Sequence, residues 1–201
     1  MKLARNAGAA AGIAVLASLT VAASAPAAAP VTGAPCAPRA FTTIFSAFGD
    51  KALYTLAPDG GFEAGAAGWT RSAGAVVAAD SSTIKLGPAL GRKSLELAPG
   101  ASVTSPAICV ERGFSGFRFV ARSVGAAKGT VSVEVLHATG KVKAGGAIKP
   151  AAGWGVTASV NLVEGQFKVM AGASTTLKLK FTASGGPVRM DDVYIDPRLR
   201  R

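Results

Sequence analysis

Few residues of this 201-residue sequence could do acid–base or nucleophilic chemistry. The chain contains one histidine, His137, two cysteines and 11 acidic residues. None of the motifs G-x-S-x-G, H-E-x-x-H, G-x-x-x-x-G-K-[ST], G-x-G-x-x-G or C-x-x-C occurs. A serine or cysteine triad would need His137 as its base. Because no nucleophile motif accompanies it, we expect His137 to be a turn or surface residue.

The acidic residues offer little for glycoside hydrolysis either. That reaction needs two carboxylates that face each other across a cleft. The glutamates Glu96, Glu111, Glu134 and Glu164 occupy positions that the local pattern predicts to be outward-facing or in loops. We therefore expect that this protein is not an enzyme.

The N-terminus has the pattern of an export signal. Lys2 and Arg5 form a short positive region, and the apolar stretch from Gly8 to Val21 ends in small residues. This pattern predicts a signal peptide over residues 1–25, cleaved between residues 23 and 29. The alternative is an uncleaved anchor, but the apolar core is shorter than the ~20 residues that a membrane span needs. We expect a secreted, extracellular protein with no membrane insertion after signal cleavage.

The composition indicates one folded domain with a basic surface. The chain has 22 Lys and Arg against 11 Asp and Glu, a formal charge of +11, and an apolar share of 49%. That share is too high for a disordered chain. Without Lys2 and Arg5, 20 basic residues remain against 11 acidic ones, so the charge of +9 belongs to the mature part. Export argues against a nucleic-acid partner, and no RNA-binding signature is present.

Both cysteines, Cys36 and Cys109, follow the predicted leader. In an oxidising compartment, an even number of cysteines first indicates a disulfide. The alternative is a catalytic cysteine paired with His137, but neither cysteine lies in a nucleophile motif. We predict a Cys36–Cys109 disulfide. In the chain-entropy model, closing a loop of about 74 residues stabilises a fold by roughly 4 kcal/mol.

The mature sequence alternates short β-type runs with Gly, Pro, Ser and Asp. In Thr175–Ala183, apolar residues alternate with Lys178 and Lys180, the period of two of a half-buried antiparallel strand. Gly129–Leu136 repeats the pattern. Further strands are predicted over Ala52–Leu56, Ala75–Ala79, Ser94–Leu97, Ser102–Thr104, Ala107–Glu111, Phe117–Arg122, Val142–Ile148, Val156–Leu162, Gln166–Met170 and Val188–Ile195.

Short strands at this spacing argue for a sandwich or a barrel rather than for βαβ units. We predict an all-β fold, an antiparallel two-sheet β-sandwich, over residues 51–197. A Pro- and Ala-rich arm over residues 26–50 precedes it, and a basic tail over residues 198–201 follows. Within the arm, apolar residues of Phe41–Phe48 recur at helical spacing, which fits either a short helix or an irregular hydrophobic segment.

Two motifs near the ends of the predicted domain resemble a known class of protein. They are Gly61-Phe62-Glu63-Ala64-Gly65, followed by Gly68-Trp69-Thr70, and Met190-Asp191-Asp192-Val193. The combination resembles the jelly-roll β-sandwiches of the galactose-binding-like class, which includes many carbohydrate-binding modules. The stretches FGDKALYTLAPDGGFEAGAAGWT, TSPAICVERG and MDDVYIDP are also similar to a group of secreted proteins of high-GC bacteria. The resemblance implies a jelly-roll fold and a non-catalytic binding function.

The same resemblance implies a metal site. In that class the opening Glu and the closing Asp often share a structural Ca²⁺, and these positions match Glu63 and Asp191. Calcium takes 6–8 oxygen ligands, so the Gly-rich backbone at residues 60–61 could add carbonyls. The adjacent carboxylates Asp191 and Asp192 would repel each other without a cation. Alternatively, backbone N–H groups or an arginine or lysine side chain satisfy the two carboxylates.

Two kinds of side chain are candidates for ligand contact. Carbohydrate modules stack sugar rings on exposed aromatic side chains. Trp154, in a Gly-flanked turn, is either such a platform or packs under a loop, whereas Trp69 is expected in the core. The outward Lys178 and Lys180 either contact anionic polymers or serve solubility.

Two functional hypotheses follow. In the first, the protein is a secreted non-catalytic module that binds an extracellular or cell-envelope carbohydrate. In the second, it is a structural or adhesive envelope protein whose basic surface binds anionic polymers or a protein partner.

Overall fold

The computed structural model describes residues 36–111, 116–140, 142–161 and 173–196. The predicted signal peptide, the predicted strand Gln166–Met170 and the basic tail lie outside the described residues. Within the described ranges the chain forms β-strands and one 3₁₀ helix, Ser46–Phe48. No helix in this part of the chain is long and apolar enough to span a bilayer.

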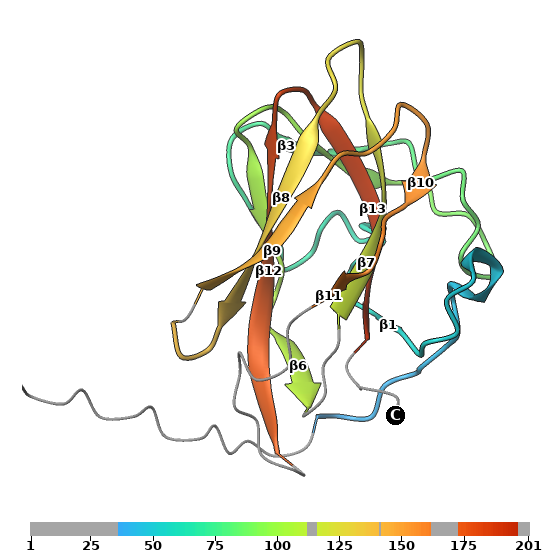
Figure 1. The fold of residues 1–201 in the computed structure, drawn as a ribbon, viewed down its shortest axis with the longest axis vertical. Coiled ribbons are helices and arrows are strands. Elements are labelled where there is room, and N and C mark those ends of the chain that lie inside the picture. Colours follow the sequence, from blue (N-terminus) through green and yellow to red (C-terminus); the bar gives the residue numbers. More distant parts are fainter. Residues whose placement is uncertain (1–35, 112–115, 141, 162–172, 197–201) are drawn as a thin grey trace, which may run out of the picture.

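One antiparallel sheet contains seven strands (Figure 1). Their order is β10-β7-β13-β4-β3, with β1 beside β13 and β11 beside β7. The strands are β1 (Thr55–Leu56), β3 (Ala75–Ala78), β4 (Ser94–Leu97), β7 (Gly116–Ser123), β10 (Gly155–Val156), β11 (Val160–Asn161) and β13 (Val188–Asp196).

The second antiparallel sheet contains six strands in the order β2-β5-β12-β8-β9, with β6 beside β12. They are β2 (Thr70–Arg71), β5 (Ser102–Thr104), β6 (Ile108–Glu111), β8 (Thr130–His137), β9 (Val142–Ile148) and β12 (Ser174–Ser184). The prediction of an all-β fold with two antiparallel sheets is therefore confirmed.

Most strands predicted within the described ranges are present, with three differences. The predicted strand Ala52–Leu56 is reduced to the two residues of β1. The two-residue strand β2 was not predicted, because two residues are too short to show an alternating pattern. The predicted strand Val156–Leu162 is divided into β10 and β11. Between them, the Thr157 N–H donates to the Phe119 carbonyl at 2.9 Å, and Thr157 Oγ1 accepts from the Phe119 N–H at 3.1 Å. A side-chain oxygen thus replaces one backbone acceptor beside β7.

The core lies between the two sheets, where the alternating residues of each strand meet. Phe181 of β12 is fully buried, and its ring contacts those of Trp69, Phe117 and Phe119 at centroid distances of 5.3–6.2 Å. Trp69 is buried as expected, and its indole Nε1 donates to the Pro58 carbonyl at 2.8 Å. Aromatic contacts of this kind stabilise a core beyond the area that they bury.

The predicted disulfide is confirmed: Cys36 and Cys109 are bonded, with their Cα atoms 5.7 Å apart. It ties the N-terminal arm to β6. Of the two forms predicted for the arm, the irregular hydrophobic segment is the one observed. It contains a single 3₁₀ turn, which ends at Gly49 in the left-handed conformation. It runs along the outside of the seven-stranded sheet (Figure 1), where Phe45 packs with Tyr54 and Val120 in a second apolar cluster.

Candidate functional site

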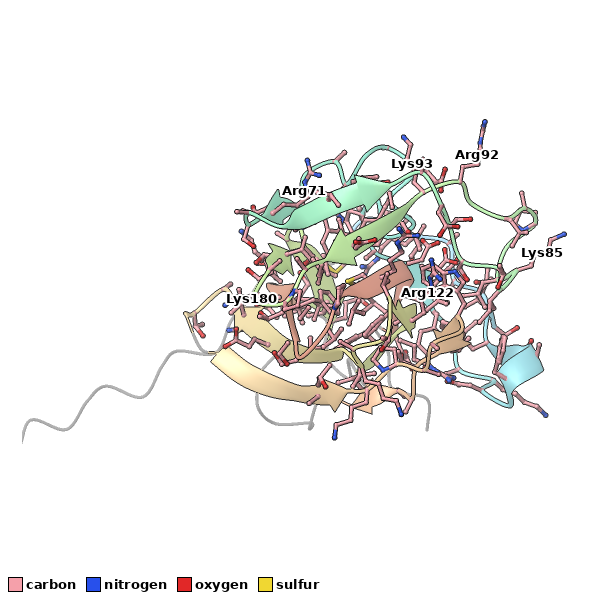
Figure 2. All side chains as sticks on the ribbon, turned by 90° about the horizontal axis from the view of Figure 1, so that it is seen from above. Arg71, Lys85, Arg92, Lys93, Arg122 and Lys180 are labelled. Carbon is pink, nitrogen blue, oxygen red and sulfur yellow. A yellow bond between two sulfur atoms is a disulfide. The ribbon has the colours of Figure 1, made fainter. Side chains whose placement is uncertain are left out.

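The predicted ligand-binding residues lie on opposite sides of the sandwich. Lys178 and Lys180 point outward from β12, because the intervening Leu179 is buried in the core. Trp154 packs against the second apolar cluster, outside the seven-stranded sheet. Figure 2 shows Lys180 on one side and Arg122, which contacts Trp154, on the other. The fold therefore does not bring Trp154 together with the lysines.

The lysines belong to a polar surface, which we call the open face, on the outside of the six-stranded sheet. Its polar residues are Ser102, Thr104, Ser132, Glu134, Thr176, Lys178, Lys180 and Thr182, and they include no aromatic residue. Leu136, opposite Lys178, and Cys109, opposite Thr176, lie on the same side of the sheet. Strand register aligns them in rows. Lys180 lies between Thr104 and Glu134, and its Nζ pairs with Glu134 Oε2 at 2.9 Å. The alternation of inward and outward residues on the neighbouring strands was the signal that could have identified these serine and threonine residues.

Trp154 is half-buried, and a cation covers part of its ring. The Arg122 guanidinium lies 5.2 Å from the centre of the indole, while Val156 and Tyr194 belong to the same apolar cluster. A guanidinium at this distance is attracted to the electron-rich face of the ring. Trp154 thus combines the two alternatives: it packs against the protein and keeps part of its surface in solvent.

A charged network holds Arg122 over that ring. Arg122 Nη2 donates to Asp80 Oδ2 at 3.0 Å, and Arg189 Nη1 contacts the same oxygen. Arg189 Nε also donates to Glu96 Oε2 at 2.6 Å. This network joins β7, β13 and β4 to the loop over residues 80–93. No sequence motif indicated it, because its members are far apart along the chain.

Glu63 is held by the far end of the same loop. Its Oε1 accepts from the Arg92 and Lys93 backbone N–H groups at 2.7 and 2.9 Å. The Lys93 ammonium in turn donates to the Glu63 carbonyl at 2.8 Å. The Glu63 carboxylate therefore fixes the Arg92–Lys93 end of the 80–93 loop.

Asp191 is buried at the near end of that loop, with 2% of its surface exposed. Its Oδ2 accepts from the Ser82 N–H at 2.9 Å, and its Oδ1 accepts from the Asp192 N–H at 2.8 Å. Burial, followed by repulsion from Asp192 and Glu63, raises the Asp191 pKa to about 7. Burial and the Glu63 charge raise the Asp192 pKa to about 6. The negative charge of Glu63 thus disfavours ionisation of both aspartates, and the charge of Asp192 disfavours ionisation of Asp191.

This carboxylate cluster has the right donor chemistry for a hard cation. Calcium prefers carboxylate and carbonyl oxygens, and a cation would relieve the repulsion. However, no three His, Cys, Asp or Glu side chains within the described ranges are arranged to hold a metal ion. Glu63 and Asp191 each accept two backbone N–H groups. Any calcium bound there would need backbone carbonyls as well.

His137 begins a turn, as one alternative predicted, because the Gly140 N–H donates to its carbonyl at 2.9 Å, but its side chain is buried rather than on the surface. It is the last residue of β8 and is 7% exposed. Its Nδ1 lies 2.7 Å from Thr139 Oγ1 and accepts from the Thr139 N–H, and its Nε2 lies 3.1 Å from Thr175 Oγ1. Both ring nitrogens therefore have structural hydrogen-bond partners.

No protein-family model and no curated protein matches the sequence. Several solved structures are similar. A structure of TmCBM61 in complex with β-1,4-galactotriose is 14% identical, with a TM-score of 0.49, over 73% of this chain and 98% of that one. The CBM22-1 xylan-binding domain of Paenibacillus barcinonensis Xyn10C is 15% identical, with a TM-score of 0.42, over 66% and 88%. At such low identity, neither structure identifies a ligand of this chain.

Proposed function

We propose that this chain is a secreted, non-catalytic module that binds an extracellular or cell-envelope carbohydrate through the open face. Sugar hydroxyls both donate and accept hydrogen bonds. The open face offers both roles: threonine and serine hydroxyls, the Glu134 carboxylate and the ammonium groups of Lys178 and Lys180. A row such as Thr104, Lys180 and Glu134 presents three such side chains side by side.

The observation that carries the proposal is the difference between the two outer surfaces. The seven-stranded sheet is covered by the disulfide-tethered arm and by apolar residues of the 80–93 loop. On the six-stranded sheet, the arm is attached through Cys109, opposite Thr176 near one end of β12, and Thr176 and Lys178 are exposed. A rigid polar surface that the fold itself leaves uncovered is available to an extended partner.

Binding assays on the disulfide-bonded protein test this proposal. We would measure affinity for soluble cell-wall polysaccharides by affinity electrophoresis with wild type and the double variant K178A/K180A. We expect the variant to bind about tenfold or more weakly, because each charge-assisted hydrogen bond contributes about 1.5–3 kcal/mol. The control K85A/R92A removes the same charge from the 80–93 loop. Equal binding by wild type and K178A/K180A would contradict the proposal.

An anionic polymer is the second candidate partner, and the use of the acidic residues favours it. Asp191 is buried, and Asp191 and Glu63 each accept backbone hydrogen bonds, so both carboxylates are engaged within the protein. By contrast, Arg71, Lys85 and Arg92 are exposed (Figure 2). Screening separates the two candidates, because the Debye length falls from about 30 Å at 0.01 M salt to about 3 Å at 1 M. A polyanion is indicated by two results together. Binding is lost at high salt, and K178A/K180A and K85A/R92A weaken binding to the same extent.

Trp154 and the carboxylate cluster have supporting parts in this proposal. The exposed part of the Trp154 ring forms a separate sugar contact outside the seven-stranded sheet. Calcium, bound by Glu63, Asp191 and Asp192 together with backbone carbonyls, acts as a structural ion that fastens the 80–93 loop to β13. When bound, the ion supplies positive charge to these carboxylates and takes no part in a reaction.

A further inference from the structure

A pocket of about 710 Å³ opens where the β7–β8 loop meets the β9–β10 loop. Figure 1 shows both loops at the upper end of the sandwich. Residues 123–130 form one wall and residues 149–152 form the other. The volume lies within the range of about 300–1,000 Å³ that is usual for small-molecule sites.

One buried serine joins the two walls. Ser123, the last residue of β7, is 5% exposed. Its N–H donates to the Ala151 carbonyl at 2.7 Å, and its Oγ donates to the Pro150 carbonyl at 2.9 Å. The same Oγ accepts from the N–H of Gly129, at the other end of the 123–130 wall, at 3.2 Å. Because one side chain bonds both loops, the pocket is preformed.

The β7–β8 loop is also fixed against the β12–β13 turn. The Val124 N–H donates to the Pro187 carbonyl at 2.9 Å. A Cβ atom on Gly129 would overlap Val188 Cγ2 and the Gly186 carbonyl, so glycine is required for this close approach. This wall therefore has little freedom to collapse into the pocket.

The charged residues that line the pocket are all positive. Lys128 lies on one wall and Lys149 on the other, while the remaining lining residues are serine, threonine, proline, glycine and alanine. No acidic side chain lines the pocket, and neither lysine forms an ion pair within the described ranges. Two ammonium groups from opposite walls favour an anion between them.

We infer that this pocket binds an oxyanion group, a carboxylate, phosphate or sulfate, on a ligand of sugar size. Lys128 and Lys149 contact the charged group from the two walls, and the small residues leave room for the uncharged body of the ligand. The site is separate from the open face, so the inference stands whether or not the open face binds a carbohydrate.

Titration calorimetry on the disulfide-bonded protein tests the inference with two anionic probes, inorganic phosphate and digalacturonate. We expect wild type to bind at least one of them, and K128Q/K149Q to bind it about tenfold or more weakly. The probe with the tighter binding tells whether a free anion or a sugar acid is the better ligand. The control K85Q/R92Q removes the same charge from the 80–93 loop, which belongs neither to the pocket nor to the open face, and is expected to bind within about twofold of wild type.

Three results would overturn the inference. In the first, wild type binds neither anionic probe. In the second, K128Q/K149Q binds as well as wild type. In the third, both double variants lose affinity equally, which would mean that only the net charge of the surface attracts the probe. Loss of polysaccharide binding in K178A/K180A with intact digalacturonate binding would separate the open face from this pocket.

Discussion

The Arg122 guanidinium lies 5.2 Å from the centre of the Trp154 indole ring and is held there by Asp80, 3.0 Å from its Nη2. The arrangement makes Arg122 a cover for the one partly exposed tryptophan of the described chain, because Trp69 is in the core. Access to the Trp154 ring therefore depends on a residue from the neighbouring strand β7.

Removal of this cover should expose the indole. We expect acrylamide to quench the fluorescence of R122A more strongly than that of wild type, since Trp69 stays buried and only Trp154 gains exposure. The free energy of unfolding should fall by less than ~1 kcal/mol, the usual contribution of a partly exposed ion pair or cation–π contact. R71A, which changes an exposed arginine of β2, is the control, and acrylamide should quench its fluorescence as much as that of wild type. Unchanged quenching in R122A would show that other atoms cover the ring.

The carboxylate cluster predicts a specific pH dependence of stability. Burial and mutual repulsion raise the folded-state pKa of Asp191 to about 7 and of Asp192 to about 6, above their ordinary value of 3.8. Between about pH 4 and pH 7 these two aspartates therefore bind more protons in the folded protein than in the unfolded chain. The contribution of these groups to the free energy of unfolding consequently falls as the pH rises through this window.

D192N tests this dependence, because it removes one titrating group and the repulsion that it exerts on Asp191. In calcium-free buffer near pH 8, urea denaturation should show D192N to be more stable than wild type by on the order of 1–2 kcal/mol. Near pH 4 the difference should vanish. E134Q, at the open face, is the control. A variant no more stable than wild type at pH 8 would argue against the repulsion.

Calcium should reverse the effect of this repulsion. If the ion binds at Glu63, Asp191 and Asp192, its addition at about 100 times its Kd stabilises the folded protein by about 2.7 kcal/mol. The melting temperature of wild type should then be higher in calcium than in chelator, and E63Q/D192N should melt at the same temperature in both. Magnesium, which prefers tighter octahedral sites, is the control ion. Identical wild-type curves with calcium and chelator would exclude this site.

The disulfide should contribute strongly to stability, because Cys36 and Cys109 are 73 residues apart in the sequence. The chain-entropy model gives about 4 kcal/mol for a loop of this length. Urea denaturation of C36S/C109S should show a loss of that order, together with a looser arm around Phe45. Wild type treated with reductant is the matching control. A double variant as stable as the oxidised protein would mean that the arm is held by its apolar contacts alone.

Much of the fold was accessible from local patterns. Alternation located β4, β5 and β9 to the residue and β12 within one residue at each end, because the period of two is carried by the strand itself. The number and position of the cysteines predicted the disulfide. The candidate site was harder to predict. The pairing of Lys180 with Thr104 and Glu134 depends on strand register, which the alternation of one strand does not encode.

The sequence by itself determined which side chains point inward and which point outward, since Leu179 and its lysine neighbours alternate within one strand. Only the tertiary structure decided which distant residues meet. It separated Trp154 from Lys178 by the thickness of the sandwich, buried His137, and placed Lys128 and Lys149 on facing walls of one pocket. The physical reason is that the burial preference of a side chain is local, whereas neighbours across sheets and loops follow from the order in which strands pair.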